Sequence, residues 1–346
     1  MTASPFFPKE SKILFRLRRA PLENHLRILV PRWAGRPLDI ASKELPSNAS
    51  FVNYVRHHRI VDPDTGLTID LVEKSIRKLL FLSSQEARFH RLTGMLSASQ
   101  GFRHPQCLGV IDTPWESLIF TTFVPGKPPR MQTIARYLGL CVAEQERLSN
   151  SYLAAQSIYQ KPLLWTMDFF RPWFLVRPRF NFTRYLPVLK TLEINDKRFS
   201  GLADEFEAFV PYLRRLAHDV QPSPRCISHM DYLRKNLFVE NGHLHLIDWS
   251  EVKVGRVGFD AGSYLGSLFR RKDITEFLSA QAEFTQGYLA GLPEQFSAQE
   301  ALRNMHYVFL LTALYHCLRP EIIAEYRTRI DMTDLLGKYR YLLSLL

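Results

Sequence analysis

The sequence has no long hydrophobic run and no secretory signal. A membrane-spanning helix needs about 20 consecutive apolar residues. The longest apolar stretch, residues 307–318, is interrupted by Thr312 and His316, so it predicts a buried core helix instead. The N-terminal residues 1–19 lack an apolar segment followed by small residues, which excludes a secretory signal peptide.

Cysteine is scarce and is never paired in a CxxC motif. The four cysteines lie far apart in the chain: Cys107, Cys141, Cys226 and Cys317. This spacing argues against a disulfide framework and against a zinc site, and it fits a reducing cytoplasm.

Acidic residues are fewer than basic ones, and the net charge is +11. An excess of this size concerns partners, not fold, and points to phosphates, an anionic membrane surface or nucleic acid. Nucleic acid is disfavoured because no helix-turn-helix, zinc-finger or RNP pattern occurs.

The chain is nevertheless long and apolar enough for a sizeable core. With 346 residues, 46% of them hydrophobic, it predicts two domains or one large two-lobed domain. Residues 1–35 form a basic extension whose apolar positions, interrupted at Pro21, predict two short amphipathic helices. This extension either docks on the domain or contacts a membrane or partner surface.

Residues 36–124 predict a small antiparallel sheet with one helix laid across it. Alternating strands at 51–61 and 67–76 flank a Pro-Asp-Thr-Gly turn. A helical pattern follows at 83–96, and a further strand at 117–124.

Residues 125–346 are mainly helical. Helices are predicted at 133–148, 201–219, 275–289, 298–318 and 331–346. Two short strands, 237–240 and 244–247, interrupt them and are joined at Asn241-Gly242.

The most informative motif flanks this hairpin. His229, Asp231 and Asn236 form an H-x-D-x4-N pattern, and Asp248-Trp249 follows the second strand. Phosphoryl transfer needs a carboxylate at the attacking hydroxyl and hard oxygen ligands for magnesium. Asp231, Asn236 and Asp248 supply such groups, and a hairpin can bring them together.

With this motif, roughly residues 36–346 resemble the aminoglycoside phosphotransferase and choline kinase family. The resemblance implies an α+β, protein-kinase-like fold, with a small antiparallel sheet lobe and a larger, mainly helical lobe. It implies ATP and Mg²⁺ as cofactors, Asp231 as catalytic base, and Asn236 and Asp248 as metal ligands. His229, Trp249 and Asp260 would give structural support, with Asp260 bracing the loops through backbone N–H groups.

The resemblance also assigns residues of the N-terminal lobe. Lys74 would bind the phosphates and Glu86 would hold it, although Lys78 is a nearby alternative. Strand alternation directs Glu73 to the face opposite Lys74. Backbone groups around Thr122 and Val124 would meet the adenine.

One segment departs from the family pattern. Residues 44–51, which should cover the phosphates, contain no glycine, although close backbone approach to phosphate favours it. Ser47 and Asn48 would contribute donors there instead. This departure leaves open whether the protein uses ATP or GTP. It is also the one feature that supports the alternative of a catalytically silent, nucleotide-binding scaffold. Lys235 either adds charge near the phosphates or is solvated.

The acceptor is constrained only by residues 160–198, where aromatic and basic side chains interleave. They form either an ordinary packed and solvated surface or a wall for a sugar-bearing, anionic or lipid-linked acceptor. We therefore expect transfer of the γ-phosphate to a hydroxyl of a small molecule or glycan. The expected location is the cytoplasm, with peripheral contact to the inner membrane face left open.

Overall fold

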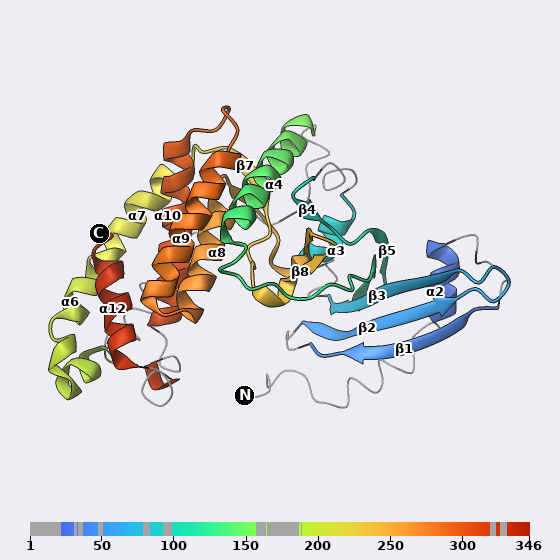
Figure 1. Ribbon diagram of the computed structural model, residues 1–346, viewed down its shortest axis with the longest axis horizontal. Helices are drawn as coiled ribbons and strands as arrows, with labels where there is room; N and C mark the ends of the chain where they lie inside the picture. The colour runs from blue at the N-terminus through green and yellow to red at the C-terminus, as the bar shows by residue number, and fades with distance from the viewer. Residues whose placement is uncertain are drawn as a thin grey trace. The chain divides into compact units, whose positions relative to one another are not determined.

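The computed structural model describes residues 22–30, 33, 37–47, 51–78, 84–92, 99–156, 164, 187, 189–318, 323–325 and 331–346. The chain divides into two compact units. Unit 1 comprises Met1–Thr93 and Pro105–Pro125, and unit 2 comprises Gly94–His104 and Gly126–Leu346. Figure 1 shows the sheet of unit 1 in blue and teal and the helices of unit 2 in green to red.

Unit 1 is built on a five-stranded antiparallel sheet of order β1-β2-β3-β6-β5. Its strands are β1 (Asp39–Leu45), β2 (Val52–Val61), β3 (Thr68–Arg77), β5 (Cys107–Asp112) and β6 (Glu116–Thr122). The β2–β3 connection turns at Gly66, whose φ of 67° favours glycine. The predicted hairpin and the third strand are therefore present.

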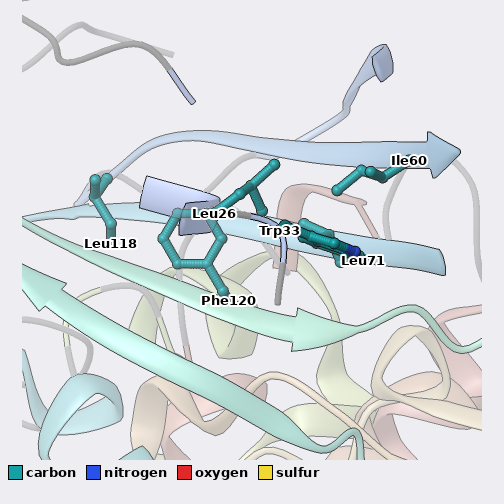
Figure 2. Packing of buried hydrophobic residues seen from close by; sticks show 6 residues of the cluster. All are labelled: Leu26, Trp33, Ile60, Leu71, Leu118 and Phe120. Carbon is teal, nitrogen blue, oxygen red and sulfur yellow. The ribbon is translucent and has the colours of Figure 1, made fainter. Parts of the chain in front are cut away.

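One helix covers each face of this sheet. On one face, α2 (Leu22–Leu29) packs a cluster of Leu26, Trp33, Ile60, Leu71, Leu118 and Phe120 against the strands. Figure 2 shows these six side chains gathered beside the sheet. On the other face, Ala87 of α3 (Gln85–His90) packs on Ile76 and Ile119. The second predicted helix of the N-terminal extension therefore docks on the sheet, while the first lies outside the described residues.

The face under α2 also buries charge. Glu73 is fully buried, its carboxylate accepts a hydrogen bond from the Tyr54 hydroxyl at 3.0 Å, and it lies 2.9 Å from Nε2 of His58. His58 in turn lies 2.7 Å from the Ser42 hydroxyl through Nδ1. Each polar atom of Glu73 thus has a partner, as burial in an apolar core demands.

Unit 2 contains the strands that flank the H-x-D-x4-N motif. The strands β7 (Arg225–Ser228) and β10 (Lys253–Arg256) pair antiparallel, and β4 (Phe102–Arg103), β9 (His243–Leu246) and β8 (Leu237–Glu240) form a three-stranded sheet. The predicted hairpin is β8–β9. Its turn residues Asn241 and Gly242 both have positive φ, which suits a tight two-residue turn.

Helices make up the rest of unit 2. They are α4 (Ala135–Ala155), α6 (Leu202–Glu207), α7 (Phe209–Asp219), α8 (Phe259–Arg271), α9 (Ile274–Gly291), α10 (Ala298–Cys317) and α12 (Met332–Leu343). The backbones of α4 and α9 approach closely where Gly139 and Gly287 lack side chains, since a Cβ on either would meet the facing backbone. No helix in the described part of the chain is long and apolar enough to span a membrane.

The structure differs from the sequence-based expectations in several places. Strands β1, β5, β7 and β10 were not predicted individually. Helix α8 was not predicted, because its small residues Gly262, Ser263 and Gly266 hide its periodicity. Helix α3 ends at His90, earlier than the predicted 96. Strand β4 belongs to unit 2, because it pairs with β9, whereas the sequence placed residues 36–124 in one lobe.

Replacing Leu26 should test whether α2 is part of the core. Leu26 is fully buried in the cluster, so Leu26→Ala is expected to lower the free energy of unfolding by about 2–5 kcal/mol. The same truncation at Ile28, which is 69% exposed on the same helix, should change it by less than about 0.5 kcal/mol. Urea denaturation of both variants measures the difference, and equal small effects would mean that α2 does not dock.

Glu73 should make stability depend on pH. Burial, and then the nearby Glu116 carboxylate, raises the pKa of Glu73 from 4.5 to about 8. The folded state therefore binds this proton more tightly than the unfolded chain. Its contribution to stability is complete below about pH 4.5 and is lost as pH rises through about 8.

Glu73→Gln keeps the hydrogen bonds of the protonated carboxyl group and cannot ionise. We expect its thermal midpoint to equal that of the wild type near pH 5 and to exceed it at pH 9, with the exposed Asp39→Asn as control. A Glu73→Gln midpoint below the wild type at pH 9 would instead indicate a carboxylate paired with protonated His58.

Candidate active site

The β8–β9 hairpin brings the two halves of the motif together. Leu237 and Leu246 are paired across the hairpin, and the Ile247 N–H donates to the Asn236 carbonyl at 3.0 Å. Asn236 immediately precedes β8 and Asp248 follows β9 by two residues, so both lie at the same end of the hairpin.

Asn236 is tied to Asp231. Its buried amide nitrogen donates to the Asp231 carbonyl and to the Asp231 carboxylate oxygen Oδ2, both at 2.9 Å. Both amide hydrogens are thereby directed at Asp231, which leaves the amide oxygen as the group that Asn236 can offer to a cation.

His229 has a structural position. Its Nδ1 accepts the Asp231 N–H at 3.2 Å, so Nε2 carries the proton and donates to the Ile247 carbonyl at 3.0 Å. The ring is fully buried and packs edge-on against Trp249, with 4.6 Å between ring centroids. His229 therefore links the loop before β8 to the end of β9 as a neutral imidazole.

Asp260, at the start of α8, binds the loop that contains His229, Met230 and Tyr232. Its carboxylate accepts the N–H groups of His229 at 3.1 Å and Met230 at 2.9 Å, and the Tyr232 hydroxyl at 3.1 Å. Burial raises the pKa of Asp260 to about 6 despite these donors. Met230 needs such support because its φ of 65° is unfavourable for a residue with a side chain.

Asp248 also has a left-handed backbone, with φ 65° and ψ 70°. This conformation turns the chain sharply after β9 into the short 3₁₀ helix Trp249–Glu251. Lys235 lies near its carboxylate, with 3.8 Å between Nζ and Oδ2. The sequence left open whether Lys235 points toward the phosphates or into solvent. Its side chain is 63% exposed although its ammonium lies near Asp248.

Several neighbouring groups shift the pKa of Asp231. Burial raises its pKa, the Lys235 charge and the Asn236 hydrogen bond lower it, and the carboxylates of Asp248 and Glu251 raise it further. A half-buried carboxylate with a raised pKa is a better proton acceptor than an exposed one.

The donor set suits a hard cation that also binds phosphate. No group of three or more His, Cys, Asp or Glu side chains able to hold a metal occurs in the described part of the chain. Asp248 and Asn236 nevertheless offer carboxylate and amide oxygens at one point. Mg²⁺ commonly takes only one or two such protein ligands, with substrate phosphates and water as the others. The residues present therefore fit magnesium bound together with a nucleotide.

In unit 1, Lys74 of β3 and Glu86 of α3 form an ion pair of 2.6 Å. Ser84 caps α3 by accepting the Ala87 N–H at 3.0 Å, which fixes where Glu86 sits. Burial, and then the Lys74 charge, lowers the pKa of His90 to about 4, so His90 stays neutral beside Glu86.

Lys78 is separated from this pair. Its side chain is 9% exposed, and its ammonium lies 3.1 Å from Asp112. The two lysines thus pair with different carboxylates, and the role of Lys74 stays a prediction.

The remaining predicted contacts lie in unit 1 as well. The Thr122 N–H donates to the Gln106 carbonyl and its hydroxyl accepts the Gln106 N–H, both at 2.9 Å. That Thr122 and Val124 contact an adenine stays a prediction. Ser47 is exposed just beyond β1, and Asn48 lies outside the described residues.

Sequence reasoning missed a buried acidic group that supports the segment leading to Asp260. Glu146 of α4 accepts the Gly258 N–H with both oxygens, at 3.0 and 2.9 Å, and the Tyr288 hydroxyl at 2.5 Å. Burial, and then Asp260, raises its pKa to about 8. Glu146 holds Gly258, which precedes Asp260. In the sequence it looks like any charged residue of a helix, and only burial distinguishes it.

The family model of the phosphotransferase enzyme family matches residues 82–295, more than half of the chain. The chain belongs to this family. The match includes Glu86, Asp231, Asn236, Asp248 and Asp260, whereas Lys74 lies before it. The predictions of the family and of a small-molecule phosphotransferase are confirmed.

Solved structures show the same fold. A choline kinase from Cryptosporidium parvum Iowa II is 13% identical with a TM-score of 0.50, and the match covers 94% of each chain. An amicoumacin kinase in complex with AMP-PNP, Ca²⁺ and Ami is 14% identical with a TM-score of 0.55, and the match covers 87% of each chain. Among curated protein sequences, none matches the phosphotransferase. The predicted α+β, protein-kinase-like fold class is confirmed.

Substituting Lys74 and Lys78 one at a time should separate the roles of these two lysines. Lys74→Met is expected to weaken nucleotide binding by about tenfold, because a fixed ammonium facing phosphate is lost. Lys78→Met should leave the affinity within about twofold and lower only the thermal midpoint, since it breaks a nearly buried pair with Asp112. Calorimetric titration with ATP compares them, and the reverse order of affinities would reassign the phosphate lysine.

Proposed function

We propose that this phosphotransferase moves the γ-phosphate of ATP to a hydroxyl group of a small molecule and requires Mg²⁺. The observation that carries the proposal is the cluster in unit 2, where Asp231, Asn236 and Asp248 meet at one end of a hairpin. A carboxylate base beside two oxygen ligands is what phosphoryl transfer to an alcohol needs.

Asp231 is the proposed base. Asn236 donates to its Oδ2, which orients the carboxylate and leaves Oδ1 for the acceptor hydroxyl. The hydroxyl oxygen forms the new bond to the γ-phosphorus while the bond to the β,γ-bridging oxygen breaks. ADP leaves with the bridging oxygen, and the hydroxyl proton passes to Asp231.

Asn236 and Asp248 are the proposed magnesium ligands. Bound magnesium supplies positive charge to the phosphate oxygens of the nucleotide. The protein contributes rigidity, because Asn236 is buried and tied to Asp231 and Asp248 follows the last residue of a short hairpin.

In unit 1, Lys74 is proposed to bind the α- and β-phosphates. Glu86 fixes its ammonium at 2.6 Å, so the charge is held in one place before the nucleotide arrives. The adenine is proposed to meet the Thr122 carbonyl and the Val124 backbone.

For the acceptor, the proposal is restricted to a hydroxyl-bearing small molecule. The aromatic and basic residues that suggested a glycan or a lipid-linked anion lie mostly at 165–186, outside the described residues. The base Asp231 specifies only that a hydroxyl proton must be taken.

Loss of Asp248 should abolish metal-dependent nucleotide binding. In calorimetry, wild type is expected to bind ATP at least tenfold more tightly with Mg²⁺ than without it, and Asp248→Ala should lose this difference. Asp219→Ala, an exposed aspartate at the end of α7, is the matched control and should behave as wild type. Folded wild-type protein that binds no nucleotide would contradict the proposal.

Asp231→Asn should separate binding from transfer. This variant is expected to retain magnesium-dependent ATP binding within a few fold and to lose at least about a hundredfold in turnover, because the proton acceptor is gone. ADP release during a screen of hydroxyl-bearing acceptors measures turnover. Equal turnover in Asp231→Asn and wild type would exclude Asp231 as the base, and wild type that binds Mg-ATP without any turnover would indicate a silent scaffold.

A further inference from the structure

Lys235 lies next to the proposed metal site, and its ammonium is held only loosely. Nζ is 3.8 Å from Oδ2 of Asp248, at the outer limit of an ion pair, and the side chain is 63% exposed. An exposed pair of this length is weak.

The backbone that carries Lys235 is fixed, in contrast to its ammonium. Lys235 lies within the 3₁₀ helix Arg234–Asn236. The Arg234 guanidinium donates to the Pro129 carbonyl at 3.1 Å on one side, and the Asn236 amide is bonded to Asp231 on the other. The side chain can therefore turn about a firmly placed Cα.

Lys253 provides an internal comparison. It also stands beside a carboxylate of this region, but its ammonium binds Glu251 twice, at the carbonyl (2.9 Å) and at Oε2 (3.0 Å), and it is 14% exposed. Of these two lysines, Lys235 is the one whose charge can move.

The charges around Lys235 explain why its ammonium would change position when ligands bind. Burial raises the pKa of Asp231, and the charge of Lys235 is the foremost influence that lowers it, so the ammonium lies within electrostatic reach of both Asp231 and Asp248. A divalent cation on Asp248 would repel the ammonium from this carboxylate, while phosphate oxygens brought by the nucleotide would attract it.

We propose that Lys235 is a displaceable cation of the active site: its ammonium neutralises Asp248 before the metal binds and then moves to phosphate oxygens of the metal-bound nucleotide. This inference rests on the proposed function.

The proposal predicts opposite effects of one substitution on two ligands. Lys235→Met should tighten binding of Mn²⁺ alone by about threefold, since a competing cation is removed, and weaken binding of Mn-ATP by about tenfold. Electron paramagnetic resonance of free Mn²⁺ measures the first and calorimetry the second. Lys235→Arg should restore most of the affinity for Mn-ATP.

Lys253→Met removes the same charge from a neighbouring, firmly held lysine and is the matched control, expected to change both affinities by less than about twofold. Changes of Lys235→Met in the same direction for both ligands, no change, or equal changes in Lys253→Met would overturn the inference. If wild type shows Asp248-dependent binding of Mn-ATP, those outcomes leave the proposed function standing. If wild type binds no metal-nucleotide, the proposed function fails and this inference with it.

Discussion

The hydrogen bonds from the backbone of His229 and Met230 to the buried Asp260 carboxylate are the constraint on which the active-site loop depends. A buried carboxylate is costly unless donors surround it, and Asp260 has three. Those donors are two consecutive N–H groups and one hydroxyl, so the carboxylate is satisfied only when the loop adopts this one conformation. Met230 keeps its unfavourable positive φ for the same reason.

From this loop the rest of the site follows by short steps. The His229 ring donates to the Ile247 carbonyl just after β9, and the Asn236 amide donates to Asp231. These hydrogen bonds connect the loop to the end of the hairpin. Behind the loop, Glu146 holds Gly258 in a left-handed conformation that leads into α8 and Asp260. Two fully buried carboxylates, Glu146 and Asp260, thus hold the backbone of Gly258, His229 and Met230 in place. Lys235 and Asp248 are more exposed, with 63% and 25% of their side chains accessible.

In unit 1, two charged residues of one strand have different surroundings. Lys74 and Glu73 are neighbours in β3, but alternation sends them to opposite faces. Glu73 lies under α2 in a closed network with His58 and Tyr54. Lys74 meets Glu86 on the face of α3, where 14% of its side chain stays exposed. The helix that covers each face therefore determines which partners each charge has.

The sequence by itself determined the elements with clear periodicity and the local motif. The β2–β3 and β8–β9 hairpins have turn residues that favour them, and the helices α4, α9, α10 and α12 have regular apolar spacing. The grouping of Asp231, Asn236 and Asp248 followed from a spacing of a few residues across one hairpin, which is a local property of the chain.

Only the tertiary structure decided what depends on contacts between distant segments. Helix α8 is buried on almost every side and has small residues where it crosses its neighbours, so it shows no amphipathic pattern. Strand β4 is assigned by its pairing with β9, more than a hundred residues away. Lys74 pairs with Glu86 and Lys78 with Asp112, and Glu146 binds Gly258 and Tyr288, all of them partners from distant segments. Burial and pairing of charges are set by the folded packing, and no single segment of the sequence contains them.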